Sequence, residues 1–126
     1  MKYGNKKTYV DDIRFDSLAE ARYYIYLRDR IRKGEIADLR LQVRFELVPA
    51  VYKTEEIQLK TKIKTIKKCV QQAICYIADF VYLEDGKEVV VDVKSAATAD
   101  NDVYKLKKKL MLALLGIEIT EVVNGK

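Results

Sequence analysis

Two apolar segments joined by an Asp-Gly turn constrain the fold more than any other feature of this chain. The first segment, "AICYIADFVYL" over residues 73–83, is apolar on both faces, as is typical of a strand in the centre of a sheet. The turn over residues 84–87 contains Asp85 and Gly86, a pair that favours a tight β-hairpin. The second segment, "EVVVDVK" over residues 88–94, is then the partner strand, and the two strands are predicted to lie side by side.

The rest of the chain predicts helices and strands around this hairpin. Residues 17–20, "SLAE", have the form of a capping box that opens a helix ending at about Lys33. Residues 39–48 alternate between apolar and polar side chains, as a half-buried strand does. A second helix over residues 102–115, capped by its first residue, and a last strand over residues 117–123 complete the order. This order predicts an α+β fold with a mixed sheet flanked by helices.

Two sets of apolar residues at helical spacing predict which faces of the helices pack against the sheet. In the first helix the set is Tyr24, Leu27 and Ile31, and Glu20 precedes it on the same face. In the second helix the set consists of Val103, Leu106, Leu110 and Leu114.

The length of the chain predicts one domain. With 126 residues, of which 49% are hydrophobic, the chain can fill a substantial core, so we expect a single domain over residues 1–126. Residues 1–16 are expected to form an irregular N-terminal arm with a short extended piece around Lys7–Val10. Residues 50–72 alternate apolar residues with lysines, a pattern that fits either an edge strand or a mobile hairpin.

The composition excludes several kinds of catalytic site. The chain contains no histidine, so neither a Ser/His/Asp triad nor a histidine-ligated metal ion can form. Its two cysteines are too few for a disulfide framework and are expected to be free thiols in a reducing cytosol. Catalysis would have to rest on carboxylates, lysines, tyrosines or a hard metal ion.

The charge and hydropathy of the chain indicate which kinds of partner it can bind. Charged residues make up 34% of the sequence, the net charge is +5 and the pI is about 9.1, a balance that is compatible with binding nucleic acid. No run of about 18 apolar residues occurs, so no membrane-spanning segment is expected. We therefore expect a cytoplasmic protein without a membrane partner.

Three charged residues interrupt the two hairpin strands. Asp79 lies in the first strand, and Asp92 and Lys94 lie two positions apart in the second, so these two face the same way. The turn can make Asp79 and Asp92 near neighbours. Two close carboxylates repel each other unless a cation lies between them, and Mg²⁺ prefers carboxylates together with waters and phosphate oxygens. Glu20, at the start of the first helix, can complete the set.

The same residues also have purely structural interpretations. Glu20 can simply be the capping-box acceptor that reaches back to the Ser17 backbone, a role that can coexist with one in the site. Asp92 and Lys94 can form a structural ion pair at a strand end. The lysines in "KTKIKTIKK" and "YKLKKKL" can simply face solvent, or they can bind phosphates if they flank the site.

At these charged residues the chain resembles the PD-(D/E)XK nuclease superfamily. An acid on the first helix, Glu20, an aspartate late in one strand, Asp79, and the pattern Asp92-Val93-Lys94 on the next strand match the motif of that superfamily. The one departure lies before Asp79, where "IAD" has alanine in place of the proline in the motif, a proline that many members lack.

Nearly the whole chain, apart from residues 50–72, resembles a family of short phage and prophage proteins with a Holliday-junction-resolvase-like core. The matching segments are "YGNKKTYVDDIRFDSLAEARYY", "GEIADLRLQVRFEL", "YIADFVY", "VVVDVKS", "VYKLKKKL" and "GIEITEV". The resemblance implies a restriction-endonuclease-like core with the order α-β-β-β-α-β, which agrees with the elements predicted above.

The resemblance also implies Mg²⁺-dependent hydrolysis of phosphodiester bonds in DNA, with Mn²⁺ able to substitute and without a small-molecule cofactor. Asp79 and Asp92 would bind the metal ion and Lys94 would position the attacking water. Glu20 would assist through the metal ion or the water.

Members of the superfamily often contribute polar side chains from the second helix to the site. Here these are Tyr104, Lys107 and Lys108, and one of the two lysines is expected to contact a phosphate of the DNA. Lys6 in the N-terminal arm and Arg44 in the strand are further candidates for DNA contacts. Arg44 can equally be an exposed polar residue without a role in the site.

The leading hypothesis is a Mg²⁺-dependent DNA endonuclease of phage or prophage recombination or DNA processing, acting in the host bacterial cytoplasm. Branched DNA such as a Holliday junction is one candidate substrate. A homodimer would suit that substrate, because a junction presents two equivalent strands to cut. The alternative is a non-catalytic nucleic-acid-binding module that retains the nuclease fold.

Overall fold

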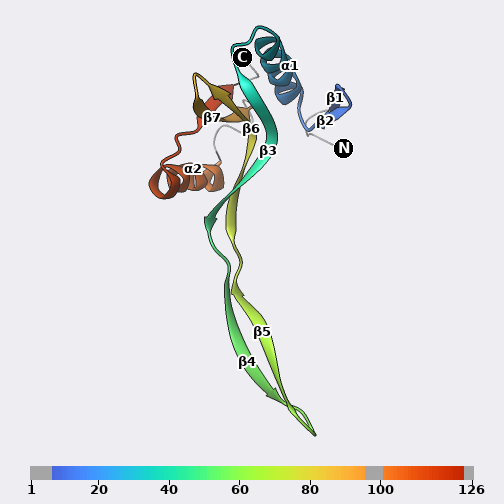
Figure 1. Ribbon diagram of the computed structural model, residues 1–126, viewed down its shortest axis with the longest axis vertical. Helices are drawn as coiled ribbons and strands as arrows, with labels where there is room; N and C mark the ends of the chain where they lie inside the picture. Colours follow the sequence, from blue (N-terminus) through green and yellow to red (C-terminus); the bar gives the residue numbers. More distant parts are fainter. Residues whose placement is uncertain (1–6, 96–100, 124–126) are drawn as a thin grey trace.

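The described residues, 7–95 and 101–123, form two helices and eight strands in this computed structural model (Figure 1). In chain order the elements are β1 (Thr8–Val10), β2 (Ile13–Phe15), α1 (Leu18–Arg32), β3 (Ala37–Val48), β4 (Val51–Gln58), β5 (Ile63–Gln71), β6 (Ile74–Glu84), β7 (Lys87–Lys94), α2 (Asp102–Leu115) and β8 (Thr120–Val123). The order α1-β3-β6-β7-α2-β8 matches the predicted α-β-β-β-α-β core, and the predicted α+β fold is confirmed. No helix in these ranges is long and apolar enough to cross a membrane.

A four-stranded mixed sheet forms the centre of the molecule, with the strand order β3-β6-β7-β8. Strand β6 pairs antiparallel with both β3 and β7, whereas β8 runs parallel to β7. The turn between β6 and β7 has Asp85 and Gly86 at positive φ (53° and 76°), as a type I′ hairpin turn requires. The predicted hairpin is therefore present, and its two strands are the inner strands of the sheet.

Helices α1 and α2 lie on opposite sides of this sheet (Figure 1). One core cluster joins Leu27 of α1 with Phe80 and Val91 of the sheet. A second cluster joins Met111 of α2 with Val90, the neighbour of Val91 that faces the other way. The sheet is buried from both sides, which explains why its two inner strands are apolar on both faces.

The ends of the helices follow local sequence signals. At the start of α1, the Ser17 hydroxyl accepts a hydrogen bond from the backbone N–H of Glu20 at 3.1 Å. In α2 the capping residue is Asn101, one position before the expected Asp102, and its side chain accepts the backbone N–H of the third helical residue. Gly116, in the left-handed conformation with φ 69°, ends α2 as predicted.

The predicted core face of α2 is right only for Leu110, which is partly buried and packs against the second core cluster, and is wrong for the other three residues. The helix buries Tyr104 and Met111, and Tyr104 donates its hydroxyl to Glu121 of β8, a contact that fixes the rotation of the helix and turns its aliphatic stripe outward. The exposed residues of that stripe are Val103 at 62%, Leu106 at 56% and Leu114 at 54%. In α1 the prediction is right for Leu27, which is fully buried, and wrong for Ile31, which is 40% exposed.

The N-terminal residues of the described part form a small hairpin, β1–β2, beside α1. Asp11 in its turn accepts hydrogen bonds from the Tyr24 hydroxyl (2.9 Å) and from the Arg28 guanidinium (3.0 Å). These hydrogen bonds, with that of Arg28 the larger cause, lower the pKa of Asp11. Within segment 1–16, expected to be an irregular arm, the described residues thus contain a hairpin attached to α1.

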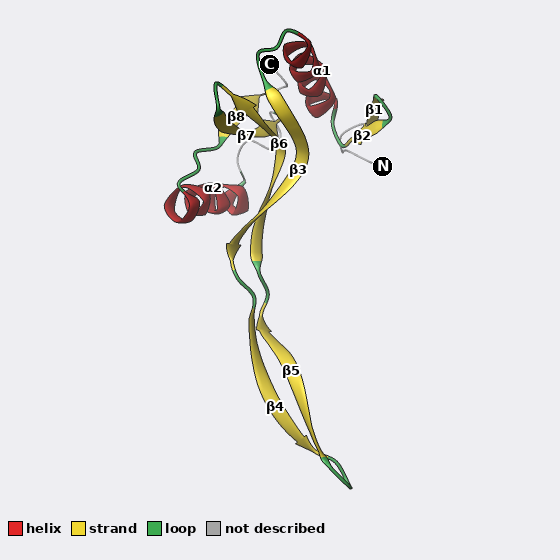
Figure 2. Ribbon diagram, in the orientation of Figure 1, coloured by secondary structure: helices red, strands yellow, loops and turns green. Residues whose placement is uncertain are grey.

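Residues 50–72 contain β4 and β5, which form a separate two-stranded sheet and extend away from the rest of the molecule as a long ribbon (Figure 2). The ribbon continues β3 and β6. Over most of both ladders the numbers of paired residues add to the same value, 121, as in Leu41–Phe80 and Tyr52–Cys69. The two ladders are therefore parts of one long hairpin that is interrupted around Pro49.

The rotation of α2 can be tested by two substitutions on opposite faces of the helix. Met111 is fully buried and Leu106 is 56% exposed. Met111→Ala should lower the free energy of unfolding by about 2–5 kcal/mol, because it leaves a cavity in the core. Leu106→Ala should change it by less than about 0.5 kcal/mol. Urea unfolding followed by circular dichroism measures both values, and a larger loss for Leu106→Ala would show that the helix has the rotation expected from its aliphatic stripe.

Candidate functional site

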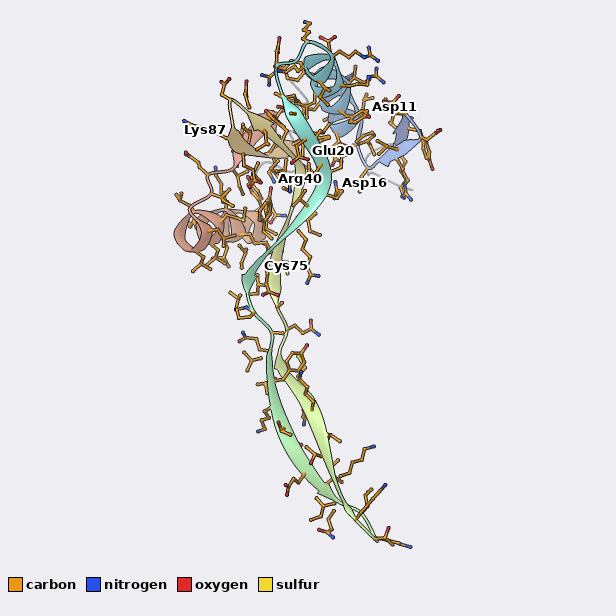
Figure 3. The ribbon with its side chains drawn as sticks, viewed as in Figure 1. Asp11, Asp16, Glu20, Arg40, Cys75 and Lys87 are labelled. Carbon is orange, nitrogen blue, oxygen red and sulfur yellow. The ribbon has the colours of Figure 1, made fainter. Side chains whose placement is uncertain are left out.

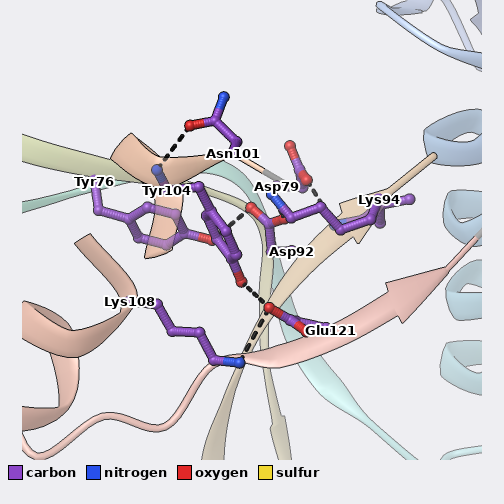
Figure 4. Close-up of polar contacts among 9 residues, drawn as sticks. Tyr76, Asp79, Asp92, Lys94, Asn101, Tyr104, Lys108 and Glu121 are labelled. Carbon is purple, nitrogen blue, oxygen red and sulfur yellow. Dashed lines mark hydrogen bonds and ion pairs between the residues drawn. The ribbon is translucent and has the colours of Figure 1, made fainter. Parts of the chain in front are cut away.

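The candidate site lies where β6 and β7 separate. Their ladder ends at the pair Phe80–Val91, so the next opposed positions are those of Asp79 and Asp92. Beyond this point β6 continues beside β3, and β7 continues beside β8. Two carboxylates thus stand where two strands of one sheet diverge (Figure 4).

Asp79 satisfies a backbone group that the divergence leaves without a ladder partner. Its Oδ2 accepts a hydrogen bond from the backbone N–H of Val93 at 2.8 Å. Burial raises the pKa of Asp79 to about 6, and the charge of Asp92 adds to the rise. The hydrogen bonds from Val93 and from the Gln42 side chain act in the opposite direction. For this partly buried acid, the hydrogen bonds therefore do not fully offset the effect of burial on the pKa.

Gln42 approaches Asp79 from the neighbouring strand in an uncommon backbone conformation. It lies opposite Asp79 in the register that pairs Leu41 with Phe80, and its φ is 52°. Non-glycine residues with positive φ are uncommon, and the associated strain is found most often at functional sites. The strain here accompanies a side chain that donates to a carboxylate of the candidate site.

Asp92 is only 7% exposed, and both of its oxygens have partners. Oδ1 accepts the hydroxyl of Tyr76 at 2.7 Å, and Oδ2 lies 2.8 Å from Nζ of Lys94. Nζ of Lys94 also lies 3.2 Å from the centroid of the Tyr104 ring, as a cation–π contact. The predicted same-face placement of Asp92 and Lys94 is present, and it takes the form of a close ion pair.

Helix α2 contributes side chains to the site on the side of β8. The Tyr104 hydroxyl donates to Glu121 Oε2 at 2.6 Å, and Lys108 Nζ lies 3.1 Å from the same oxygen. Glu121 is the partner of Asp92 in the β7–β8 ladder. The hydrogen bond from Tyr104 is the main cause that lowers the pKa of Glu121, and burial raises the pKa of Tyr104 above its usual value. Tyr104 therefore remains a protonated donor (Figure 4).

Glu20 contributes a third acid from the first turn of α1, in the sheet-containing part of the molecule (Figure 3). Burial raises its pKa to about 7, and the charges of Asp79, Asp16 and Asp92 raise it further. Glu20, Asp79 and Asp92 therefore lie within electrostatic range of one another. The raised pKa of Glu20 therefore reflects burial first and the neighbouring negative charges second.

The chemistry of these donors fits a hard dication such as Mg²⁺ or Mn²⁺. Carboxylate oxygens are the ligands that such ions prefer, and a dication would stabilise the charged forms of Glu20 and Asp79, whose pKa values are raised by burial and by the neighbouring acids. As the side chains stand, however, residues 7–95 and 101–123 contain no group of three or more acidic or cysteine side chains arranged to hold a metal ion. One oxygen of Asp92 is instead occupied by Lys94.

The other predicted site residues differ in their distance from this centre. Lys107 lines a hollow of about 320 Å³ on the outer side of Tyr104, and Lys108 is paired with Glu121. Arg44 is exposed, and its Nε donates to Cys75 Sγ at 3.2 Å, two positions along β3 from Gln42 toward the ribbon. Lys6 lies outside the described residues.

Three residues at the site, Tyr76, Glu121 and Gln42, are not among those predicted from the sequence. Tyr76 and Glu121 are polar groups in apolar strands, the same signal that revealed Asp79, and could have been found in that way. Gln42 gave no such signal, because it occupies one of several alternating polar positions in "LRLQVRFELV". Only the register between β3 and β6 distinguishes Gln42 from its polar neighbours.

The raised pKa values predict how stability depends on pH when chelator removes divalent ions. The pKa values of Glu20 and Asp79 are about 7 and about 6 in the folded protein, above unfolded values of about 4. The folded state therefore retains protons that the unfolded state releases. This stabilisation is complete below about pH 4 and is lost as the pH rises to about 7.

Glu20→Gln should therefore leave the free energy of unfolding nearly unchanged at pH 4 and raise it at pH 8. The gain should be on the order of 1 kcal/mol after allowance for solvent screening of a half-buried group. Urea unfolding across this pH range measures it, with the exposed-acid variant Glu118→Gln as the control. Superimposable pH profiles for Glu20→Gln and the unaltered protein would contradict the electrostatic description of the site.

Comparison with known proteins places the chain in a family. The sequence matches the family described as "Protein of unknown function (DUF1064)" over residues 1–120. Comparisons with curated proteins and with solved structures gave no match. Because the match covers nearly all of the 126 residues, this chain belongs to the DUF1064 family.

Proposed function

We propose that this protein is a Mg²⁺-dependent DNA endonuclease. The observation that carries the proposal is the divergence of β6 and β7, where Asp79 and Asp92 occupy opposed positions and Lys94 follows two residues later on the same face. An aspartate on one strand and the pattern Asp-x-Lys on its hairpin partner form the arrangement that the resemblance to the PD-(D/E)XK superfamily leads us to expect.

Asp79 and Asp92 would bind the metal ion, and Glu20 would assist through the ion or its water. A bound Mg²⁺ would supply charge stabilisation for the phosphate and a more acidic water. Tyr76 fixes the orientation of Asp92 through its 2.7 Å hydrogen bond. The Gln42 side chain does the same for Asp79. These two neutral donors hold the carboxylates without adding positive charge that would compete with a dication.

Lys94 would orient the attacking water and stabilise the charge that develops on the phosphate. Its Nζ is held 2.8 Å from Asp92 and 3.2 Å from the centroid of the Tyr104 ring, so a water or phosphate oxygen bound beside Asp92 lies within its reach. Lys107 and Lys108 lie on α2 within one turn of Tyr104 and would contact the DNA backbone.

The rival function is non-catalytic binding of nucleic acid by the same fold. The ion pair between Lys94 and Asp92 favours it, because this pair engages one intended metal ligand with the lysine that would serve catalysis. This function predicts DNA binding that needs no divalent ion and that persists in Asp92→Asn.

For the biological setting we propose phage or prophage recombination or DNA processing in the bacterial cytoplasm, with branched DNA as one candidate substrate. Both cysteines, Cys69 and Cys75, are free, which suits a reducing compartment. The proposal of branched DNA, and of a homodimer that would cut it symmetrically, rests on the family resemblance and not on a contact of this chain.

Cleavage assays test the proposal directly. The protein would be incubated with linear duplex, single-stranded, flapped and four-way DNA, in Mg²⁺, in Mn²⁺ and in chelator. We expect cleavage of at least one substrate with either ion and none in chelator. Asp79→Asn, Asp92→Asn and Lys94→Ala should each reduce the rate by on the order of 10²–10³-fold or more. Glu118→Gln, an exposed acid away from the site, should retain the activity.

Thermal unfolding provides a second measurement that does not depend on the choice of substrate. Mg²⁺ should raise the Tm of the unaltered protein and leave that of Asp92→Asn unchanged, because a ligand that binds only the folded state stabilises it. In chelator, Asp79→Asn should be at least as stable as the unaltered protein, since it removes a repelled carboxylate. DNA binding with no cleavage in any metal ion, and no effect of Mg²⁺ on the Tm, would support the rival function instead.

A further inference from the structure

The β4–β5 ribbon has almost no surface of its own molecule to pack against. Among residues 51–71 only Glu55 and Ile66 are half-buried, and all the others are exposed. Large apolar side chains are among them, including Tyr52 at 52% and Ile63 at 57%. A two-stranded hairpin without a packed face is only marginally stable in water. The length and exposure of this ribbon therefore indicate a surface that contacts another molecule.

The charge of the ribbon indicates what kind of molecule this is. Residues 51–71 contain six lysines and two glutamates, a net charge of +4, whereas the whole chain of 126 residues has a net charge of +5. Nearly all of the excess positive charge is thus concentrated in one protruding element. Such a distribution favours a polyanionic partner.

The pairing of the two strands places most of these lysines on one side. Side chains of directly paired residues share a face, and alternate residues along a strand face the same way. We define the lysine face by these rules from the register of β4 and β5 and the Leu59–Lys62 hydrogen bond that continues it. It consists of Lys53, Glu55, Ile57, Leu59, Lys62, Lys64, Ile66 and Lys68.

The opposite face of the ribbon is different in character. Within the strands it contains one lysine, Lys67, whose Nζ lies 4.4 Å from the centroid of the Tyr52 ring. This lysine is already engaged by an aromatic ring. The two faces therefore differ in charge, although most residues of both faces are exposed.

We propose that the lysine face of the β4–β5 ribbon docks into the major groove of duplex DNA. This inference rests on the proposed function for the choice of DNA as the polyanion. The major groove, about 12 Å wide, admits a two-stranded β-ribbon, whose strands lie about 4.8 Å apart. The lysines would contact phosphates, and Ile57 and Ile66 between them would contact thymine methyl groups or base edges.

The length of the ribbon determines how much DNA it would contact. The eight residues of β4 span about 26 Å at about 3.3 Å per residue, most of the 34–36 Å turn of B-form DNA. The ribbon would therefore engage about three-quarters of a helical turn of duplex DNA. An A-form RNA duplex has a deep, narrow major groove that does not admit such a ribbon, so the occupant is specifically duplex DNA.

Binding of a fluorescent 20-base-pair DNA duplex by the full chain, measured by anisotropy in chelator, tests this inference. The lysine-face variant replaces Lys62, Lys64 and Lys68 by Gln. The matched control also replaces three lysines by Gln, namely Lys67 on the opposite face and Lys33 and Lys87 away from the ribbon (Figure 3 labels Lys87). Thermal unfolding of each variant would verify that it is folded, as expected for changes at exposed positions.

The lysine-face variant should bind on the order of 10-fold more weakly or worse. Its slope of log K against log salt concentration should be smaller by about 2.7, because three phosphate contacts are lost. The control should bind within about 3-fold of the unaltered protein. A duplex RNA of the same length should bind the unaltered protein more weakly than the DNA does.

Three results would overturn the inference. One is equal weakening in the two variants, which would mean diffuse attraction by net charge. Another is equal affinity for DNA and RNA duplexes. The third is unchanged DNA binding by a lysine-face variant that has lost a dimer seen for the unaltered protein by sedimentation, which would assign the ribbon to contact between two copies. Because all measurements are made in chelator, a failure of DNA cleavage in Mg²⁺ bears on the proposed function alone.

Discussion

The hydrogen bond from the Val93 N–H to the Asp79 carboxylate stabilises the separation of β6 and β7 in the centre of the sheet. Two antiparallel strands that share a ladder up to Phe80–Val91 would ordinarily continue to pair. Here a side chain takes over the role of the next backbone acceptor, so β6 and β7 can part without leaving a buried N–H group unsatisfied. Beyond this point β6 continues beside β3 and β7 beside β8, and Asp79 and Asp92 lie between these two strand pairs.

The same interaction keeps a carboxylate in a partly buried position, where charged groups are uncommon in folded proteins. Asp79, Asp92 and Glu20 are all withdrawn from solvent to some degree, and two of them have raised pKa values. Neutral donors, one ammonium group and a strained backbone at Gln42 hold this arrangement in place. Local features that reduce stability and yet are supported on every side are typical of sites selected for function rather than for folding.

Most of the fold was predictable because its signals are local. The Asp-Gly turn, the serine cap of α1 and Gly116 at the end of α2 act through neighbouring residues, and the elements follow from them. Asp79, Asp92 and Lys94 were conspicuous because they are charges within apolar strands. The rotation of α2 was not predictable, because its aliphatic stripe competes with Tyr104, and the outcome depends on Glu121, a residue 17 positions away.

The ribbon and Gln42 were beyond sequence analysis for a related reason. Alternating lysines and apolar residues describe a strand without stating what it pairs with, so the segment after Pro49 fitted an edge strand as well as a hairpin. Gln42 acquires its importance only from lying opposite Asp79. Pairing between distant segments of the chain, and not the properties of single residues, decided both cases.

The shared register of the β3–β6 and β4–β5 ladders has a consequence for how this chain tolerates insertions and deletions. Because both belong to one hairpin, loss of equal numbers of residues from its two strands near the tip shortens the ribbon and leaves Gln42 facing Asp79. Loss of a single residue from one strand instead shifts the pairing by one and turns alternate side chains to the wrong face unless a bulge absorbs it. Relatives of this chain can therefore have β4–β5 ribbons of different lengths while the four-stranded sheet stays unchanged, provided that the two strands of the ribbon change length together.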